Sequence, residues 1–103
     1  MKIGISSTDS DFETAGVDPR FGRCNFFIIY DTETKEYKAY PNPAKEAVGG
    51  AAMRAVEFLR EKGVEKVITG NVGPNAESAL GAAGIELVKG VTGKVKEAVE
   101  RYK

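Results

Sequence analysis

The chain has 103 residues, the size of one domain, and no linker-like stretch divides it, so we expect a single domain over residues 1–103. Hydrophobic residues at 42% and charged residues at 29% are typical of a globular protein and exclude disorder of the whole chain. The 15 basic and 15 acidic residues give a formal net charge of zero, whereas a dedicated nucleic-acid binder normally carries a basic excess. We therefore expect no nucleic-acid partner.

The sequence contains no apolar run long enough for a signal peptide or a membrane span. Its single cysteine cannot form an internal disulfide, in agreement with a reducing compartment. We therefore expect a cytoplasmic protein without a membrane partner. Histidine and tryptophan are absent and Glu and Lys dominate the charges, a bias that resembles proteins from hot habitats.

The first half of the chain predicts three strands that form an antiparallel meander. Their segments are residues 2–6, 25–31 and 36–40. The first alternates, with Ile3 and Ile5 on one face, and the second is almost continuously aromatic and β-branched, as in a strand buried on both faces. The third alternates like an edge strand that Pro41 and Pro43 end.

The stretch between the first two strands, residues 7–23, is long and has no clear period. Loops of this length in a compact domain are usually functional or mobile. Few apolar residues precede Phe21, so we expect this loop to have few anchors and to be the most mobile part of the protein.

The second half alternates helices and strands. Apolar residues recur at i, i+3, i+4 and i+7 in three stretches, which predicts three helices that each present one apolar stripe to a sheet. The stripes are Ala52, Ala55, Val56 and Leu59; Ala76, Ala79, Leu80 and Ala83; and Val95, Ala98, Val99 and Tyr102. Gly63 and Gly84 are placed to end the first two helices, and residues 66–69 and 85–88 have strand patterns.

This order of elements predicts an α/β fold with a mixed five-stranded sheet and helices on both faces. If the meander pairs in sequence and the crossovers are right-handed, the strand order is 3-2-1-4-5. The loops that follow the first, third, fourth and fifth strands then open on one edge of the sheet. Ligands of open α/β sheets bind at such an edge, so we expect the site there.

The segment 18–24, DPRFGRC, combines two guanidinium groups with a thiol. Arg20 and Arg23 offer planar forks for carboxylate or phosphate oxygens, and a nearby positive charge favours the thiolate of Cys24, which binds soft metals. The alternative interpretation places Phe21 in the core, Gly22 in a turn and the arginines in surface ion pairs.

Two glycine-containing stretches precede helices on the same edge. Gly49 and Gly50 open the first helix, where free backbone N–H groups favour an anion; close packing of the helix on the sheet explains them equally well. Asn71, Gly73 and Pro74 lie before the second helix, with proline suited to its first position, but the stretch lacks the lysine and hydroxyl of a P-loop.

Several catalytic constellations are absent. Without histidine the chain has no ordinary Ser-His-Asp or Cys-His machinery and too few ligands for a usual zinc site. Two-metal nuclease chemistry needs carboxylates on the sheet, whereas Asp9, Asp11 and Glu13 lie in the loop beyond the first strand. We therefore expect binding rather than catalysis.

Three stretches, in their order and spacing, resemble the dinitrogenase iron–molybdenum cofactor biosynthesis family. They are KIGIS, DPRFGRCNFFIIYD, and the stretch from GGAAMRAVEFL to NAESALGAAGIEL. The family includes NifX-like domains, which also occur at the end of NifB and in NafY, and the resemblance covers nearly the whole chain. It implies a ribonuclease H-like three-layer α/β/α fold without nuclease activity.

The resemblance further implies a non-catalytic binding or carrier domain for an iron–sulfur or iron–molybdenum type metallocofactor or its precursor, a monomer or weak homodimer with cofactor-assembly proteins as partners. The alternative is a regulatory or protein-interaction module that keeps the fold without binding a cluster. Cofactor-binding relatives often have His before the Phe-Gly pair, where this chain has Arg20, which cannot donate a lone pair to a metal. The predicted cofactor-binding residues are Arg20, Arg23, Cys24, Gly49, Gly50, Asn71 and Gly73, with Cys24 as the metal ligand.

Overall fold

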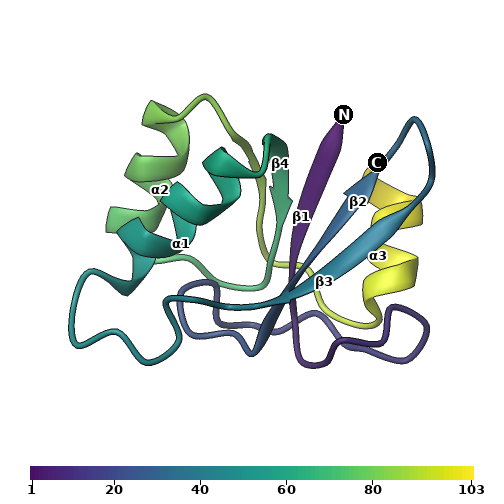
Figure 1. The fold of residues 1–103 in the computed structure, drawn as a ribbon, viewed down its shortest axis with the longest axis horizontal. Helices are drawn as coiled ribbons and strands as arrows, with labels where there is room; N and C mark the ends of the chain where they lie inside the picture. Colours follow the sequence, from purple (N-terminus) through teal and green to yellow (C-terminus); the bar gives the residue numbers. More distant parts are fainter.

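The computed structural model describes residues 1–103 as a five-stranded sheet with three helices (Figure 1). The strands are β1 (Lys2–Ser7), β2 (Phe26–Asp31), β3 (Tyr37–Pro41), β4 (Val64–Ile68) and β5 (Glu86–Val88). The helices are α1 (Ala51–Glu61), α2 (Pro74–Ala82) and α3 (Val95–Tyr102). Each predicted element is present, with small shifts at its ends. None of the helices is long and apolar enough to cross a bilayer.

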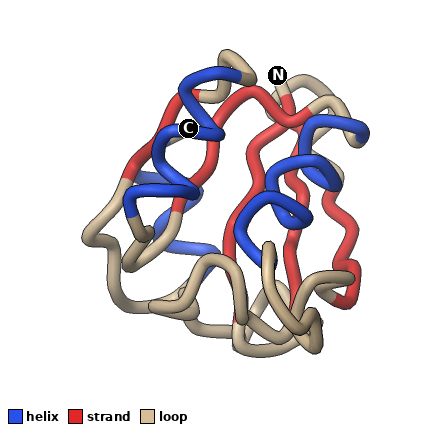
Figure 2. Tube along the Cα trace, turned by 90° about the vertical axis from the view of Figure 1, so that its left-hand side faces the viewer, coloured by secondary structure: helices blue, strands red, loops and turns tan.

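The predicted strand order is confirmed: the sheet runs β3-β2-β1-β4-β5. β2 pairs antiparallel with β1 and β3, whereas β4 pairs parallel with β1 and β5, so the meander and the crossovers share one mixed sheet. Helices α1 and α2 cover one face and α3 covers the other, which gives three layers (Figures 1 and 2). This agrees with the expected α/β class and layer order.

The core has two halves, one on each face of the sheet. Leu59 of α1 and Leu80 of α2 pack with Phe27 on one face, while Val95 and Val99 of α3 pack on the other with buried residues of β1 and β2. All of the predicted helix stripes face the sheet, because their spacing places apolar side chains on one side of each helix. On β1, Gly4 faces α1, where a Cβ would lie 3.2 Å from Leu59 Cδ2, so its small size lets the helix approach closely.

The expectation that the loop after β1 has few apolar anchors is wrong. Phe12, Ala15 and Val17 are buried, and the Phe12 ring stacks on that of Tyr37 with 4.4 Å between centroids. The Val17 N–H donates to the Gly93 oxygen at 2.8 Å, which ties this loop to the one before α3. Sequence periodicity could not reveal these anchors, because they pack on the sheet from an irregular loop rather than from one face of a regular element.

Candidate functional site

Three loops that follow β1, β3 and β4 meet at the edge where the parallel strands end, which we call the carboxyl edge. The arginine loop (residues 18–24) lies against the loop before α2 through two hydrogen bonds: Asn71 N–H donates to the Pro19 oxygen at 2.7 Å and Phe21 N–H to the Asn71 oxygen at 3.3 Å. A Cβ on Gly70 would lie only 2.5 Å from Pro19 Cα, so the two backbones are in direct contact. These contacts hold the arginine loop rigidly at one end.

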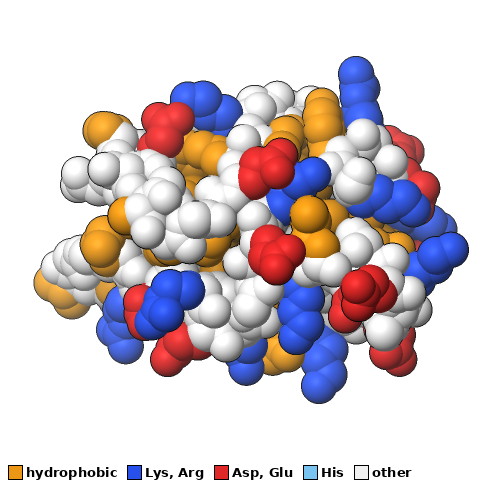
Figure 3. Space-filling view, turned by 90° about the horizontal axis from the view of Figure 1, so that it is seen from above, with side chains coloured by type: hydrophobic (Ala, Val, Ile, Leu, Met, Phe, Trp, Pro, Cys, Tyr) orange, Lys and Arg blue, Asp and Glu red, His pale blue; other side chains and the backbone are white.

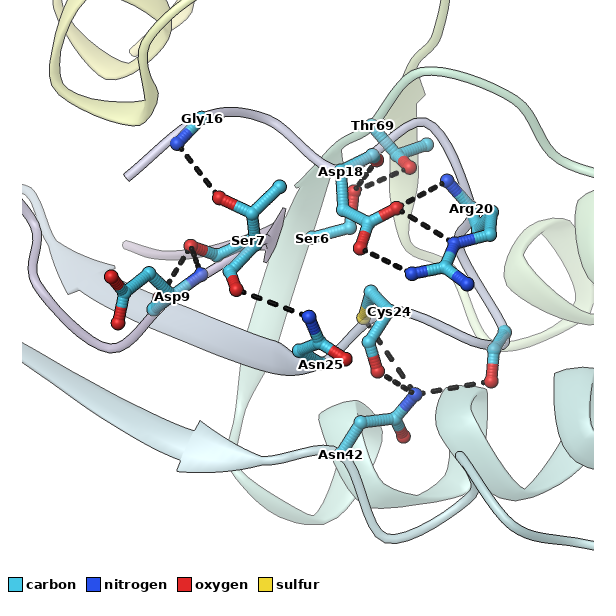
Figure 4. Close-up of polar contacts among 12 residues, drawn as sticks. Ser6, Ser7, Asp9, Gly16, Asp18, Arg20, Cys24, Asn25, Asn42 and Thr69 are labelled. Carbon is cyan, nitrogen blue, oxygen red and sulfur yellow. Dashed lines mark hydrogen bonds and ion pairs between the residues drawn. The ribbon is translucent and has the colours of Figure 1, made fainter. Parts of the chain in front are cut away.

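At its other end the arginine loop is joined to the β3–α1 loop by Asn42, a buried residue that the sequence analysis did not single out. The Asn42 amide donates to the backbone oxygens of Gly22 at 3.0 Å and Cys24 at 3.1 Å (Figure 4). Its Oδ1 accepts the Ala44 N–H at 2.9 Å. The available sequence signal was an asparagine between two prolines directly after a strand, which is a turn pattern with no indication of a distant partner.

Arg23 points toward the same β3–α1 loop. Its Nη1 donates to the Lys45 oxygen at 2.8 Å and to the Ala47 oxygen at 2.7 Å. The surface ion pair of the alternative interpretation does not describe this arrangement, since the partners are backbone carbonyls. Arg23 therefore fixes the loop that carries Gly49 and Gly50, and adds positive charge there. Anion binding by Arg23 stays a prediction.

Arg20 forms an ion pair with Asp18, as the alternative interpretation expected. Asp18 Oδ1 accepts the Arg20 backbone N–H at 2.9 Å and Nε–H at 3.2 Å, and Oδ2 accepts Nη2–H at 3.1 Å (Figure 4). Burial alone would raise the pKa of Asp18, but the hydrogen bonds and charge of Arg20 outweigh it and hold that pKa below its ordinary value. The Asp18 side chain is 2% exposed and that of Arg20 58%, so a buried carboxylate supports an exposed guanidinium.

Cys24 lies beneath these residues and is fully buried. Burial, reinforced by the negative charge of Asp18, raises the pKa of the Cys24 thiol to about 12, and the opposing effect of Arg20 is smaller. The charge of Arg20 does favour the thiolate, as expected, but burial and the charge of Asp18 outweigh it in this conformation. The Asn42 amide is 3.6 Å from Sγ and covers it from the loop side. Metal binding by Cys24 stays a prediction.

Helices α1 and α2 begin at the carboxyl edge without a side-chain cap. Gly50 caps α1 in a left-handed conformation and Gly73 caps α2, and the first helical backbone bonds are Arg54 N–H to the Gly50 oxygen and Glu77 N–H to the Gly73 oxygen. The preceding N–H groups have no partner within their helices, and they carry the positive ends of the helix dipoles. A Cβ on Gly49, Gly50 or Gly73 would meet nothing within 4 Å, so close packing does not explain these glycines.

The side chains at this edge do not form a conventional metal centre. No group of three or more His, Cys, Asp or Glu side chains is arranged to hold a metal ion. Asp11 and Glu13 are also engaged away from β1: Asp11 Oδ1 accepts the Glu13 N–H, and Glu13 forms an ion pair with Lys96 at 2.7 Å. The arrangement therefore suits hydrogen bonding to an anion better than ligation of a bare metal ion.

The opposite edge of the molecule has a different character. Viewed from that side, Lys, Arg, Asp and Glu side chains are interspersed (Figure 3). A hollow beside the β2–β3 hairpin is lined by Lys2, Asp31, Glu36 and Lys38 together with aromatic and aliphatic side chains, so opposite charges line the same hollow. It offers no comparable preference for anions.

The fold and the carboxyl edge together define a small three-layer α/β domain with an exposed arginine and two helix N-termini without side-chain caps on one side. The chain belongs to the dinitrogenase iron–molybdenum cofactor family, whose family model matches residues 1–103. This confirms the resemblance seen in the sequence.

Solved structures share the fold over almost the whole chain. The apo form of the orange protein from Desulfovibrio gigas is 33% identical, with a TM-score of 0.93 over 98% of this chain and 85% of that one. A putative NifB protein from Thermotoga is 37% identical, with a TM-score of 0.83 over the same shares of the two chains. A relative found by sequence, an uncharacterized protein of Methanocaldococcus jannaschii, is 26% identical over 99% of this chain and 89% of its own length.

Proposed function

We propose that this protein is a non-catalytic domain that binds and carries an anionic metallocofactor, an iron–sulfur or iron–molybdenum type cluster or its precursor. Membership of the family supports the class of ligand. The observation that carries the proposal is the exposed Arg20 guanidinium, fixed by Asp18 in a loop that contacts both the α1 start and the loop before α2. Positive charge and free N–H groups are thereby gathered on one edge.

In this proposal the cluster is cargo that arrives assembled. Side chains able to ligate metal do not cluster here, so charge and hydrogen bonds supply most of the binding. Arg20 and Asn71 contact the cluster through their side chains, and Gly49, Gly50 and Gly73 let it approach the backbone. Arg23 adds charge while holding the β3–α1 loop. A bond from Cys24 to metal requires that the thiol lose its proton and that the Asn42 amide move away.

The proposed setting is the cytoplasm, where the protein acts as a monomer or weak homodimer and passes the cluster to cofactor-assembly proteins. A second candidate function is a regulatory or protein-interaction module. It is favoured by one observation: Val48 and Met53, on either side of the glycine pair, are 104% and 57% exposed although both are apolar. Exposed apolar side chains grouped at one place can mark a protein contact.

Anaerobic reconstitution tests the proposal. The protein is incubated with a preassembled iron–sulfur cluster donor, separated from the donor, and measured for bound iron and for visible charge-transfer absorption. Arg20→Ala is expected to lower bound iron, because it removes the charge fixed at the site. The matched control is Arg60→Ala in α1, which removes an exposed arginine that is paired with Glu57 away from the carboxyl edge.

Cys24→Ser distinguishes ligation from electrostatic binding in the same experiment. Loss of most iron with an unchanged fold would support a direct metal bond from Cys24. Iron equal to that of the parent would show that the cluster is held without this thiol. Absence of iron and absorption in the parent itself would contradict the carrier function and favour the interaction module.

A further inference from the structure

The ion pair between Asp18 and Arg20 uses only one side of the guanidinium. A guanidinium has five N–H donors in a planar fork. Asp18 accepts from Nε and from one hydrogen of Nη2, at 3.2 Å and 3.1 Å. Both hydrogens of Nη1 and the second hydrogen of Nη2 are left over, and they form the outer edge of the fork. No protein group accepts a hydrogen bond from Nη1 of Arg20. Its side chain is 58% exposed, so these donors are open to a ligand.

The direction of this outer edge is fixed by contacts that a surface arginine normally lacks. Asp18 cannot turn, because its side chain is 2% exposed and its own backbone oxygen accepts the Ser6 hydroxyl at 2.7 Å. That hydroxyl is in turn 2.7 Å from the Thr69 hydroxyl at the end of β4 (Figure 4). Arg20 itself is bound at its backbone N–H by the same carboxylate. The guanidinium is therefore oriented before any ligand arrives, which lowers the entropy lost on binding.

We infer that Asp18 is a positioning residue that turns Arg20 into a two-point anion receptor, selective for ligands with two neighbouring acceptor atoms. This inference rests on the proposed function and names the chemistry of its ligand. Suitable groups are a carboxylate, a tetrahedral oxyanion, or the oxygen- or sulfur-bearing face of an anionic cluster. A spherical anion has only one acceptor atom and a lysine ammonium has no planar fork, so neither forms two parallel hydrogen bonds of this kind.

Removing Asp18 changes two things, and they act in opposite directions. The loss of its negative charge strengthens long-range attraction of an anion, whereas the loss of orientation weakens the two-point contact. At about 0.5 M salt the screening length falls to about 4 Å, which suppresses the part of this attraction that passes through solvent. The effect of orientation is therefore measured at high salt, with low salt as the reference.

The test measures molybdate binding by equilibrium dialysis at both salt concentrations, using the parent, Asp18→Asn, Arg20→Lys and the double variant. At high salt, Asp18→Asn and Arg20→Lys should each weaken binding about tenfold, the scale of one charge-assisted hydrogen bond. Asp18→Asn should add little in the Arg20→Lys background, because lysine has no fork to orient. A purely structural role for Asp18 would instead give the same loss in both backgrounds, and that result overturns the inference.

Two further results would also overturn it: equal or tighter binding by Asp18→Asn at high salt, and absence of molybdate binding by the parent. Far-ultraviolet circular dichroism establishes that each variant is folded. Should Asp18→Asn fail to fold, Arg20→Lys is compared with Arg60→Lys, and parent-like binding by Arg20→Lys overturns the two-point contact. Iron reconstitution of the same proteins judges the carrier function separately, since molybdate binding without cluster uptake rejects only the cluster as cargo.

Discussion

Gly70→Ala tests the direct backbone contact between the β4–α2 loop and the arginine loop. The new Cβ would lie 2.5 Å from Pro19 Cα, 3.1 Å from its Cβ and 3.2 Å from its oxygen. These atoms belong to the backbone and a rigid ring and cannot rotate away, so the arginine loop must move. The movement would break the hydrogen bonds from Asn71 to Pro19 and from Phe21 to Asn71.

The expected cost follows from these contacts. Overpacking a well-packed site costs about 1–3 kcal/mol, and each lost backbone hydrogen bond costs about 0.5–1.5 kcal/mol. The reduced freedom of the unfolded chain returns about 0.4–1 kcal/mol, so the free energy of unfolding should fall by about 1–5 kcal/mol. With a slope of about 2 kcal/mol per molar urea, the midpoint of a urea titration followed by circular dichroism should fall by about 0.5–2.5 M.

Gly81→Ala is the matched control for this substitution. Gly81 lies in α2 and is exposed, and a Cβ added there would meet nothing within 4 Å, so alanine should stabilise the helix by up to about 1 kcal/mol. A urea midpoint for Gly70→Ala at or above that of the parent would refute the backbone contact. It would also remove the reason for regarding the arginine loop as rigid at that end.

Three further outcomes are expected. Leu80→Ala should lower the free energy of unfolding by about 2–5 kcal/mol, and the exposed Ser78→Ala by far less; a loss below about 0.5 kcal/mol for Leu80 would contradict its burial. Burial raises the pKa of Cys24 to about 12, so the thiol of the unfolded chain loses its proton at lower pH than that of the folded chain. The free energy of unfolding should therefore fall as pH rises above the ordinary pKa of 9.0, by at most about 1.4 kcal/mol per pH unit. This part of the fall should be missing in Cys24→Ala. Amide exchange should be slow at Val17, whose N–H is bonded, and fast at the exposed Asp11, whose N–H has no partner; equally fast exchange at both would restore the expectation of a mobile loop.

The parts of the fold that were predicted correctly depend on local repetition. The spacing around Leu59 and Leu80 determined two helices and their buried faces, and Gly63 and Gly84 ended them in left-handed conformations, with φ of 79° and 72°. The strand order followed from handedness rules that hold for any chain with this succession of elements. The ribonuclease H-like assignment stays a prediction from the resemblance.

The candidate site was predicted less completely. The sequence identified the arginine loop and the glycines before α1 and α2, and the structure brings these to one edge. It did not reveal Asn42 as the link between two loops, and it gave no reason to expect different partners for Arg20 and Arg23. Their partners are different: a buried carboxylate for Arg20 and backbone carbonyls for Arg23.

The sequence by itself determined the elements, their order and the edge at which the loops after the parallel strands meet, because these depend on spacing along the chain and on general rules of chain connection. Only the tertiary structure decided which donors remain free and which thiol or carboxylate is buried. The pKa of Cys24 shows why: it depends on burial and on the charge of Asp18, six positions earlier in the chain, whereas the local sequence draws attention to the neighbouring arginines. The interaction between two charges depends on their distance in the folded structure, whereas periodicity describes only the spacing of residues along the chain.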